Sequence, residues 1–275
     1  MTQSCIVCDS SSSYFFEKKY DSYKGSPFSG ALAVRYFKCN RCGFVFSETH
    51  REMDKEKWED LNSSWHHAFE SGVFGSDINQ PPYANMALAT KMLAVNGLLN
   101  MGASLDYAAG YGTFAKILKK YFNETIYKYD PYVIGEKDDY YIESTDLREY
   151  DFLVNTAMFE HILTRNDIDS VNNLVSDGGV MMLHTQIREE IPKDPNWFYL
   201  TPHVHSAFFT NKSMRILMEQ WKYSCSIYSP EARVWFLFKK DYPFSDRIES
   251  VFSSINQELQ REYFFYKEGF MDYWK

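Results

Sequence analysis

Between residues 104 and 186 the sequence alternates short apolar runs with amphipathic segments, and this alternation constrains the fold more than any other feature. The segments between the runs, such as FAKILKKYF (114–122), have the spacing of helices. The apolar runs are SLDY (104–107), ETIYKYD (124–130), YDFLVNTA (150–157) and GGVMMLHTQ (178–186). Strands joined through helices pair in parallel by right-handed crossovers. The pattern therefore predicts an α/β fold in which helices cover both faces of a parallel sheet.

Two further strand-like runs follow, YSCSIYS (223–229) and RVWFLFKK (233–240). Because only a few residues separate them, they are expected to pair antiparallel. A helix is expected just before the first strand, in ANMALATKMLAVNGLL, and another at 211–221. The aromatic-rich tail, residues 244–275, is expected to be mostly helical.

Composition limits the classes of partner and compartment. The chain has 275 residues, 45% of them hydrophobic, and a formal net charge of −8. Nucleic-acid-binding proteins normally show a basic excess, so a nucleic-acid partner is disfavoured. No apolar run is long enough to span a bilayer, and the N-terminus lacks the regions of a secretory signal. We therefore expect a cytoplasmic protein without a membrane partner.

Four of the five cysteines form two C-x-x-C pairs, Cys5 with Cys8 and Cys39 with Cys42. Each pair can form a tight knuckle, and two knuckles supply the four thiolates of a closed, structural zinc site. In KCNRCGF, Gly43 can take the positive φ that the knuckle needs. Free thiols and an iron–sulfur cluster are the alternative interpretations, and the paired spacing favours zinc.

These features divide the chain into four expected parts. Residues 1–60 form a zinc-ribbon-like segment, with nine basic and nine acidic side chains. Residues 61–84 form a Gly- and Pro-containing connector. Residues 85–243 form the α/β domain, and residues 244–275 form the tail.

The stretch LDYAAGYGTF, residues 105–114, predicts a nucleoside-binding loop. Asp106 ends the first strand, and Gly110 and Gly112 lie in the turn before the helix, where glycine lets a ligand approach the backbone. The loop matches neither G-x-G-x-x-G nor the P-loop. Asp130 ends the second strand about twenty residues later, where an acid can accept both ribose hydroxyls. These residues alone leave NAD and other nucleosides open.

The blocks LDYAAGYGTFAKIL, IYKYDPY, YDFLVNTAMFEHI and GGVMMLHT together resemble the motif series of class I S-adenosylmethionine-dependent methyltransferases. The resemblance covers roughly residues 85–240. It implies a Rossmann-like seven-stranded sheet whose last strand is antiparallel, with S-adenosylmethionine as the cofactor. The family's D-x-G-x-G-x-G loop falls on Asp106, Ala108, Gly110 and Gly112, so Ala108 replaces the first glycine.

The same resemblance assigns further cofactor contacts. It implies that Asp130 holds the ribose and that Asp146 lies near the adenine. It also implies that Asn155–Ala157 border the methionine end. Tyr111 lies inside the loop and is expected to contact the cofactor.

The front of the chain, CIVC…KCNRCGFVFSE, resembles the zinc-binding front of methyltransferases in sugar and polysaccharide pathways. This implies a small-molecule acceptor, first of all a sugar or polysaccharide precursor. Deoxysugar C-methyltransferases of this kind usually carry a further C-terminal domain that this chain is too short to hold. Methylation at O, N or C therefore stays open.

Several histidines are candidates for a general base, because histidine acts near neutral pH. His205 is the first candidate and His203 the second, because TPHVHSAFFTNKSM resembles a substrate-facing block of the family. The alternative for either residue is packing or capping within its own loop. Glu160 and His161, in MFEHI, are expected to support the cofactor end or the fold, and His184 is expected to be a core histidine.

Three other functions remain open at this stage. An RNA methyltransferase would use the cysteine segment to grip its substrate, although the acidic charge disfavours it. A non-catalytic binding module would fit the change to Ala108. An NAD-dependent oxidoreductase is disfavoured by the missing third glycine. The sequence does not indicate an oligomeric state.

Overall fold

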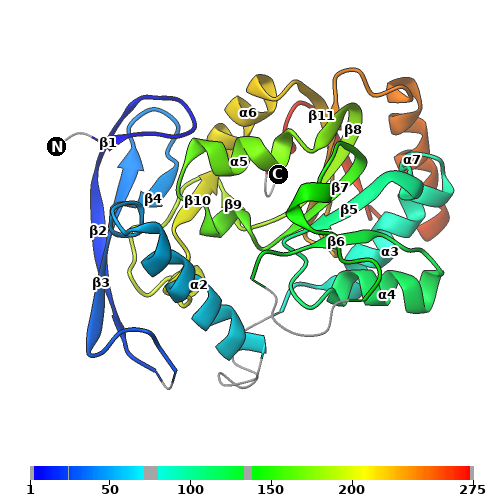
Figure 1. Cartoon of the computed structure of the whole chain (residues 1–275). Coiled ribbons are helices and arrows are strands. Elements are labelled where there is room, and N and C mark those ends of the chain that lie inside the picture. The colour runs from blue at the N-terminus through cyan, green and yellow to red at the C-terminus, as the bar shows by residue number, and fades with distance from the viewer. Residues whose placement is uncertain (1–2, 24, 71–79, 133–137, 273–275) are drawn as a thin grey trace.

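The computed structural model describes residues 3–23, 25–70, 80–132 and 138–272, and they build two β-sheets that stand side by side. Figure 1 shows the N-terminal sheet and helix α2 on the left and the larger sheet with its helices on the right. Within these described residues, five 3₁₀ turns connect elements: η1 (Met101–Ala103), η2 (Ser144–Asp146), η3 (Phe159–His161), η4 (Phe198–Leu200) and η5 (Ser245–Arg247).

The larger sheet has seven strands in the order β13-β11-β12-β8-β7-β5-β6. Strands β6, β5, β7 and β8 are parallel, and β12 runs antiparallel to both β8 and β11. Their bounds are β5 (Ser104–Tyr107), β6 (Tyr127–Tyr129), β7 (Tyr150–Thr156), β8 (Val175–His184), β11 (Tyr223–Ser229), β12 (Val234–Lys239) and β13 (Phe265–Glu268). The predicted seven-stranded α/β sheet with its antiparallel end is confirmed.

Helices cover both faces of this sheet because its central strands are apolar on both sides. In β7, Phe152 and Val154 pack into one core and Leu153 into the other. Helices α3 (Tyr83–Val95), α4 (Thr113–Phe122) and α7 (Ile248–Leu259) cover the first face, and α5 (Arg165–Asn172) and α6 (Asn211–Gln220) cover the second.

The N-terminal sheet has six strands in the order β1-β2-β3-β4-β10-β9. Its members are β1 (Gln3–Ser4), β2 (Ser11–Asp21), β3 (Ala31–Cys39), β4 (Val45–Ser47), β9 (Ile187–Arg188) and β10 (Ala207–Thr210). Strands β9 and β10 come from the part of the chain predicted to belong to the α/β domain. The two sheets are therefore tied together by the chain itself.

The pairing of β4 with β10 forms this junction. Ala207 lies opposite Phe46, and the Ser47 amide donates to the Ser206 carbonyl at 2.7 Å. Phe209 is fully buried, and its ring centroid lies 5.0 Å from that of Phe44 and 5.6 Å from that of Phe159. One continuous core therefore runs from the N-terminal sheet into the α/β domain.

Two segments differ from their expected form. Helices α1 (Glu48–Arg51) and α2 (Lys55–Glu70) follow β4, so a regular helix enters the segment expected to be a connector. The Gly72 and Gly75 positions of that connector lie outside the described residues. The tail contains the expected helix, α7, and then β13, which adds a strand to the edge of the sheet beside β11. Within the described residues, no helix is long and apolar enough to cross a membrane.

We predict that Phe209→Ala destabilises both sheets together. Truncating a fully buried phenylalanine costs about 3–5 kcal/mol, and this side chain contacts the cores of both units. Urea unfolding followed by tryptophan fluorescence and by circular dichroism should show one transition with a lowered midpoint. Two separate transitions, with only one of them shifted, would contradict a shared core.

Candidate active site

A large cavity lies where the carboxyl ends of the parallel strands meet helix α2, which is where open α/β sheets bind their ligands. Its volume is about 1560 Å³. One wall carries the loop after β5 and Asp130, and another carries residues after β7 and β8. The third wall comes from α2, which supplies Trp58, Asn62 and His66.

The loop after β5 turns through three residues with positive φ, Ala108 at 60°, Gly110 at 54° and Gly112 at 72°. A Cβ on Gly112 would lie 2.8 Å from Cδ of Lys128, so a larger residue would both strain this left-handed backbone and displace the lysine. Lys128 is buried beneath the loop, and its Nζ lies 2.5 Å from Oδ2 of Asp138. The turn is therefore supported from below and presents its backbone to the cavity.

Asp130 follows β6 and lies against this loop. Its carboxylate accepts the backbone N–H of Gly110 and that of Tyr132, both at 2.8 Å. Each carboxylate oxygen keeps a further lone pair. Since the carboxylate is fixed by two amides at the cavity wall, it can accept ribose hydroxyls. Asp130 therefore fits the cofactor-binding role expected of it.

The structure brings only some of the predicted cofactor residues to the cavity. Ala108, Gly110, Tyr111 and Asp130 line it. Gly112 is buried behind the loop.

The other three predicted residues lie elsewhere. Asp106 is buried in β5, with one carboxylate oxygen unpartnered among the described residues, and burial followed by the charge of Asp130 raises its pKa to about 8. Asn155 is buried at the end of β7 and does not line the cavity. Asp146 is exposed in η2 and is not among the residues that line the cavity. These positions favour supporting roles for Asp106 and Asn155.

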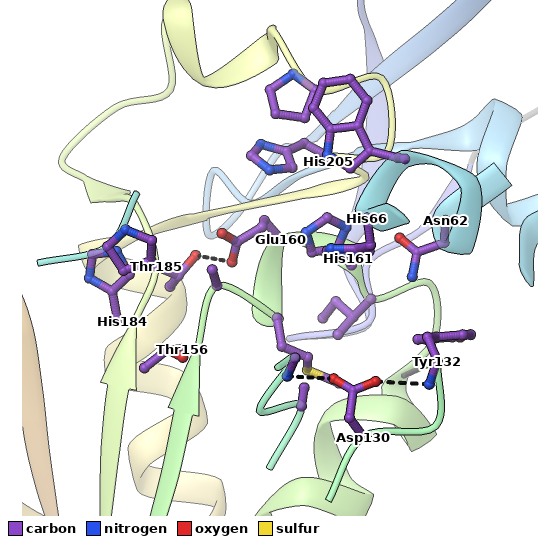
Figure 2. A pocket seen from close by; sticks show the side chains of 18 of the residues that line it. Asn62, His66, Asp130, Tyr132, Thr156, Glu160, His161, His184, Thr185 and His205 are labelled. Carbon is purple, nitrogen blue, oxygen red and sulfur yellow. Dashed lines mark hydrogen bonds between the residues drawn. The ribbon is translucent and has the colours of Figure 1, made fainter. Parts of the chain in front are cut away.

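Across the cavity from Asp130 stands a cluster of Glu160, His161 and His205 (Figure 2). One ligand atom of each residue lies within 4.8 Å of those of the other two. Glu160 and His161 end η3, just after β7, and His205 lies just before β10. The amide of Ser206 donates to the carbonyl of Glu160 at 2.7 Å, which fixes the two segments against each other.

One ring nitrogen of His205 forms a hydrogen bond, and the other is free. Its Nδ1 lies 2.7 Å from the carbonyl oxygen of Tyr199, and a carbonyl can only accept, so Nδ1 carries the proton. The Nε2 lone pair is therefore left for the cavity. Burial lowers the pKa of His205 to about 3, so the ring stays neutral at physiological pH.

Glu160 is held by two hydroxyl groups. Tyr199 donates to its Oε1 at 2.6 Å, and Thr185 donates to its Oε2 at 2.9 Å. Burial raises the pKa of this carboxyl group above its ordinary value. The ring of His161 lies 5.0 Å from that of His66 on α2 and 5.0 Å from that of His205, so His161 is the middle of three neighbouring imidazoles.

His203, the second histidine expected near the substrate, does not line the cavity. Four aromatic rings, those of Tyr20, Tyr23, Phe28 and Trp65, lie within about 6 Å of its ring. Burial lowers its pKa to about 4. We infer that His203 packs its own loop, which was the alternative interpretation.

The four cysteines converge as their spacing predicts. Sγ of Cys5 lies 3.7 Å from that of Cys42, and Sγ of Cys8 lies 3.5 Å from that of Cys39. A tetrahedron with Zn–S bonds of about 2.3 Å has edges of about 3.8 Å. Backbone amides at 3.4 Å also point at Sγ of Cys5 and Cys39. The donor set and its geometry therefore fit a tetrahedral metal ion.

A family model described as a methyltransferase domain matches residues 83–224, more than half of the chain. The chain belongs to this methyltransferase family. The match covers the glycine loop, Asp130 and the Glu160–His161–His205 cluster, and it establishes the S-adenosylmethionine-dependent methyltransferase domain expected from the motif series. Membership of this family also excludes the alternative of an NAD-dependent oxidoreductase.

Solved methyltransferase structures resemble the chain at low identity. The plantazolicin methyltransferase BpumL, in complex with a pentazolic desmethylPZN analog and SAH, is 13% identical, with a TM-score of 0.44 over 78% of this chain and 90% of that chain. Magnesium protoporphyrin IX methyltransferase from Synechocystis PCC 6803, with bound SAH, is 12% identical, with a TM-score of 0.44 over 68% and 100%. No curated protein matches the chain significantly.

We predict that Asp130→Ala weakens binding of S-adenosylhomocysteine about 100-fold, because two hydrogen bonds to a charged acceptor are lost. Isothermal titration calorimetry measures the change. Asp146→Ala is the matched control, since Asp146 is exposed and lies outside the cavity. Equal losses in both variants, or none in Asp130→Ala, would be inconsistent with this ribose site.

We predict that Ala108→Gly raises the thermal stability of the protein. An alanine at a φ of 60° is strained, and glycine removes a penalty of about 1 kcal/mol. Differential scanning calorimetry should show an increase in Tm of a few degrees, roughly what that energy implies for a domain of this size. A lowered Tm would mean that the alanine methyl group makes contacts that outweigh its backbone strain.

Proposed function

We propose that this protein transfers the methyl group of S-adenosylmethionine to a small-molecule acceptor bound in the cavity. One observation carries the proposal: a single cavity is lined both by the cofactor loop with Asp130 and by the Glu160–His161–His205 cluster. When bound, S-adenosylmethionine supplies a methyl group on a positively charged sulfur. The cluster lies where the acceptor would approach that group.

The residues of the chain hold the cofactor in place and enclose the acceptor. Gly110 and Asp130 fix the nucleoside end, and α2 closes the cavity on the opposite side. Alignment of the two reactants supplies a large part of the acceleration in such a displacement. His205, the residue for which the sequence indicates a role in activating the acceptor, faces the acceptor with its free Nε2.

The acceptor is proposed to be a small hydroxylated compound such as a sugar or polysaccharide precursor. Trp58 and Asn62, both on α2, line the cavity and are buried. An aromatic face next to an amide suits a ring that carries hydroxyl groups. The net charge of −8 supports a small molecule over RNA, whose phosphates would be repelled.

We also propose that the four cysteines hold a structural zinc ion. The knuckles pack directly on the α/β domain: Thr210 donates to the carbonyl of Cys42 at 2.6 Å, and Gln220 donates to that of Val7 at 3.0 Å. Four thiolates leave no open position for catalysis. The ion would thus stabilise the sheet that carries β10.

We predict that His205→Ala lowers methyl transfer by about 10²- to 10⁴-fold, because the acceptor loses its activating group. Binding of S-adenosylmethionine should be retained, since the cofactor loop is untouched. Transfer of labelled methyl groups to nucleotide sugars and to the small-molecule fraction of a cell extract measures the effect. His203→Phe, which fills the aromatic surroundings of His203, should keep full transfer. The proposal fails if the two variants behave alike.

We predict that purified protein contains one zinc ion per chain and that Cys42→Ser loses it. Structural zinc contributes roughly 10 kcal/mol or more to folding of its site, so the variant should unfold at markedly lower temperature. Elemental analysis and calorimetry measure the two effects. Protein that is folded, fully active and free of zinc would contradict the structural role.

A further inference from the structure

We propose that Glu160, His161 and His205 hold a divalent metal ion in the acceptor part of the cavity, and that this ion activates an acceptor hydroxyl for methylation. The inference rests on the proposed function and narrows it to oxygen acceptors. It concerns a second metal site, separate from the four cysteines.

The three side chains are a donor set that suits a divalent metal ion. Two imidazoles and one carboxylate are typical ligands of Zn²⁺, Mn²⁺ and Fe²⁺. One ligand atom of each lies within 4.8 Å of those of the others, so the three donor groups converge on one small space. Three protein ligands leave coordination positions open for a substrate oxygen. A structural site such as the cysteine cluster has no such position.

The hydrogen bonds made by the ligand side chains also support a metal site. Histidines that bind a metal ion donate their other ring N–H to a fixed acceptor. Nδ1 of His205 does so to the carbonyl of Tyr199 at 2.7 Å. Nδ1 of His161 is buried and has no hydrogen-bond partner among the described residues. The backbone thus orients the ring of His205, and each of the two rings keeps one nitrogen free for a ligand.

The carboxylate of Glu160 shows the same arrangement. It accepts hydrogen bonds from Tyr199 and Thr185 and still has lone pairs for an ion. Glu160 is 2% exposed, and within the described part of the chain no lysine or arginine forms an ion pair with it. A buried carboxylate normally has a cationic partner. A divalent cation would supply the missing positive charge.

The position of the cluster gives the ion its chemistry. An acceptor hydroxyl bound at an open coordination position becomes more acidic, as metal-bound water does. It releases its proton to water in the cavity, and an oxygen lone pair then forms the O–CH₃ bond. The S–CH₃ bond breaks with its electrons staying on sulfur, which leaves neutral S-adenosylhomocysteine. His205 then acts as a ligand rather than as a free base.

Titration of the zinc-loaded full-length protein with Mn²⁺ alone, followed by electron paramagnetic resonance and calorimetry, tests the inference. We expect one Mn²⁺ per chain at the cluster. Glu160→Gln keeps the size of the side chain and an acceptor for Tyr199, but removes the charge, and should weaken Mn²⁺ binding more than about 10-fold. His184→Ala is the matched control, because His184 lines the same cavity, with Nδ1 held by the carbonyl of Arg233 at 2.8 Å, and lies outside the cluster.

A separate titration with S-adenosylhomocysteine keeps the two proposals apart. Absence of Mn²⁺ binding by protein that binds S-adenosylhomocysteine would overturn the metal site and leave methyl transfer standing. Mn²⁺ binding that Glu160→Gln leaves unchanged would also overturn it. Absence of S-adenosylhomocysteine binding by folded protein would instead contradict the proposed function itself.

Discussion

The pairing of β4 with β10 is the interaction on which the rest of the structure depends. It joins a strand that begins three residues after the second cysteine knuckle to a strand that begins two residues after His205. The same short segment donates from Ser206 to the carbonyl of Glu160. These contacts therefore join the cysteine cluster, the N-terminal sheet and the acceptor side of the cavity into one packed unit. Loss of the cysteine ligands would disturb the positions of Glu160 and His205, although these residues are far away in sequence.

The two ends of the cavity are built by different means. At the end near the glycine loop, the conformation of the backbone shapes the cavity. Ala108 and Ala157 both have positive φ, 60° and 54°, and both line the cavity. Such strain persists only where the surrounding structure holds it. At the acceptor end, side chains from η3, from the loop before β10 and from α2 converge. This division suits a protein that binds a shared cofactor and a particular acceptor.

The sequence predicted the parts that depend on local patterns. Strand β5 and the start of α6 fall where periodicity placed them, the cysteine pairs converge as their spacing implied, and Asp130 lies against the glycine loop. It could not predict that β10 pairs with the N-terminal sheet, because the sequence of a four-residue apolar strand does not show which strand it pairs with. It also did not indicate His66, because α2 lies in a segment expected to be a connector and the spacing within a helix does not show which part of the chain the helix packs against. Asp146 and His203, which the family resemblance assigned to the site, are not among the residues that line the cavity.

The central claim is that one cavity holds the cofactor on Asp130 with its sulfur directed at the Glu160–His161–His205 cluster. A crystal structure of the protein with S-adenosylhomocysteine tests this most directly. The account predicts ribose hydroxyls on the carboxylate of Asp130 and the sulfur atom facing the cluster across an open space for the acceptor. A cofactor bound elsewhere, or bound with its sulfur turned away from the cluster, would contradict it.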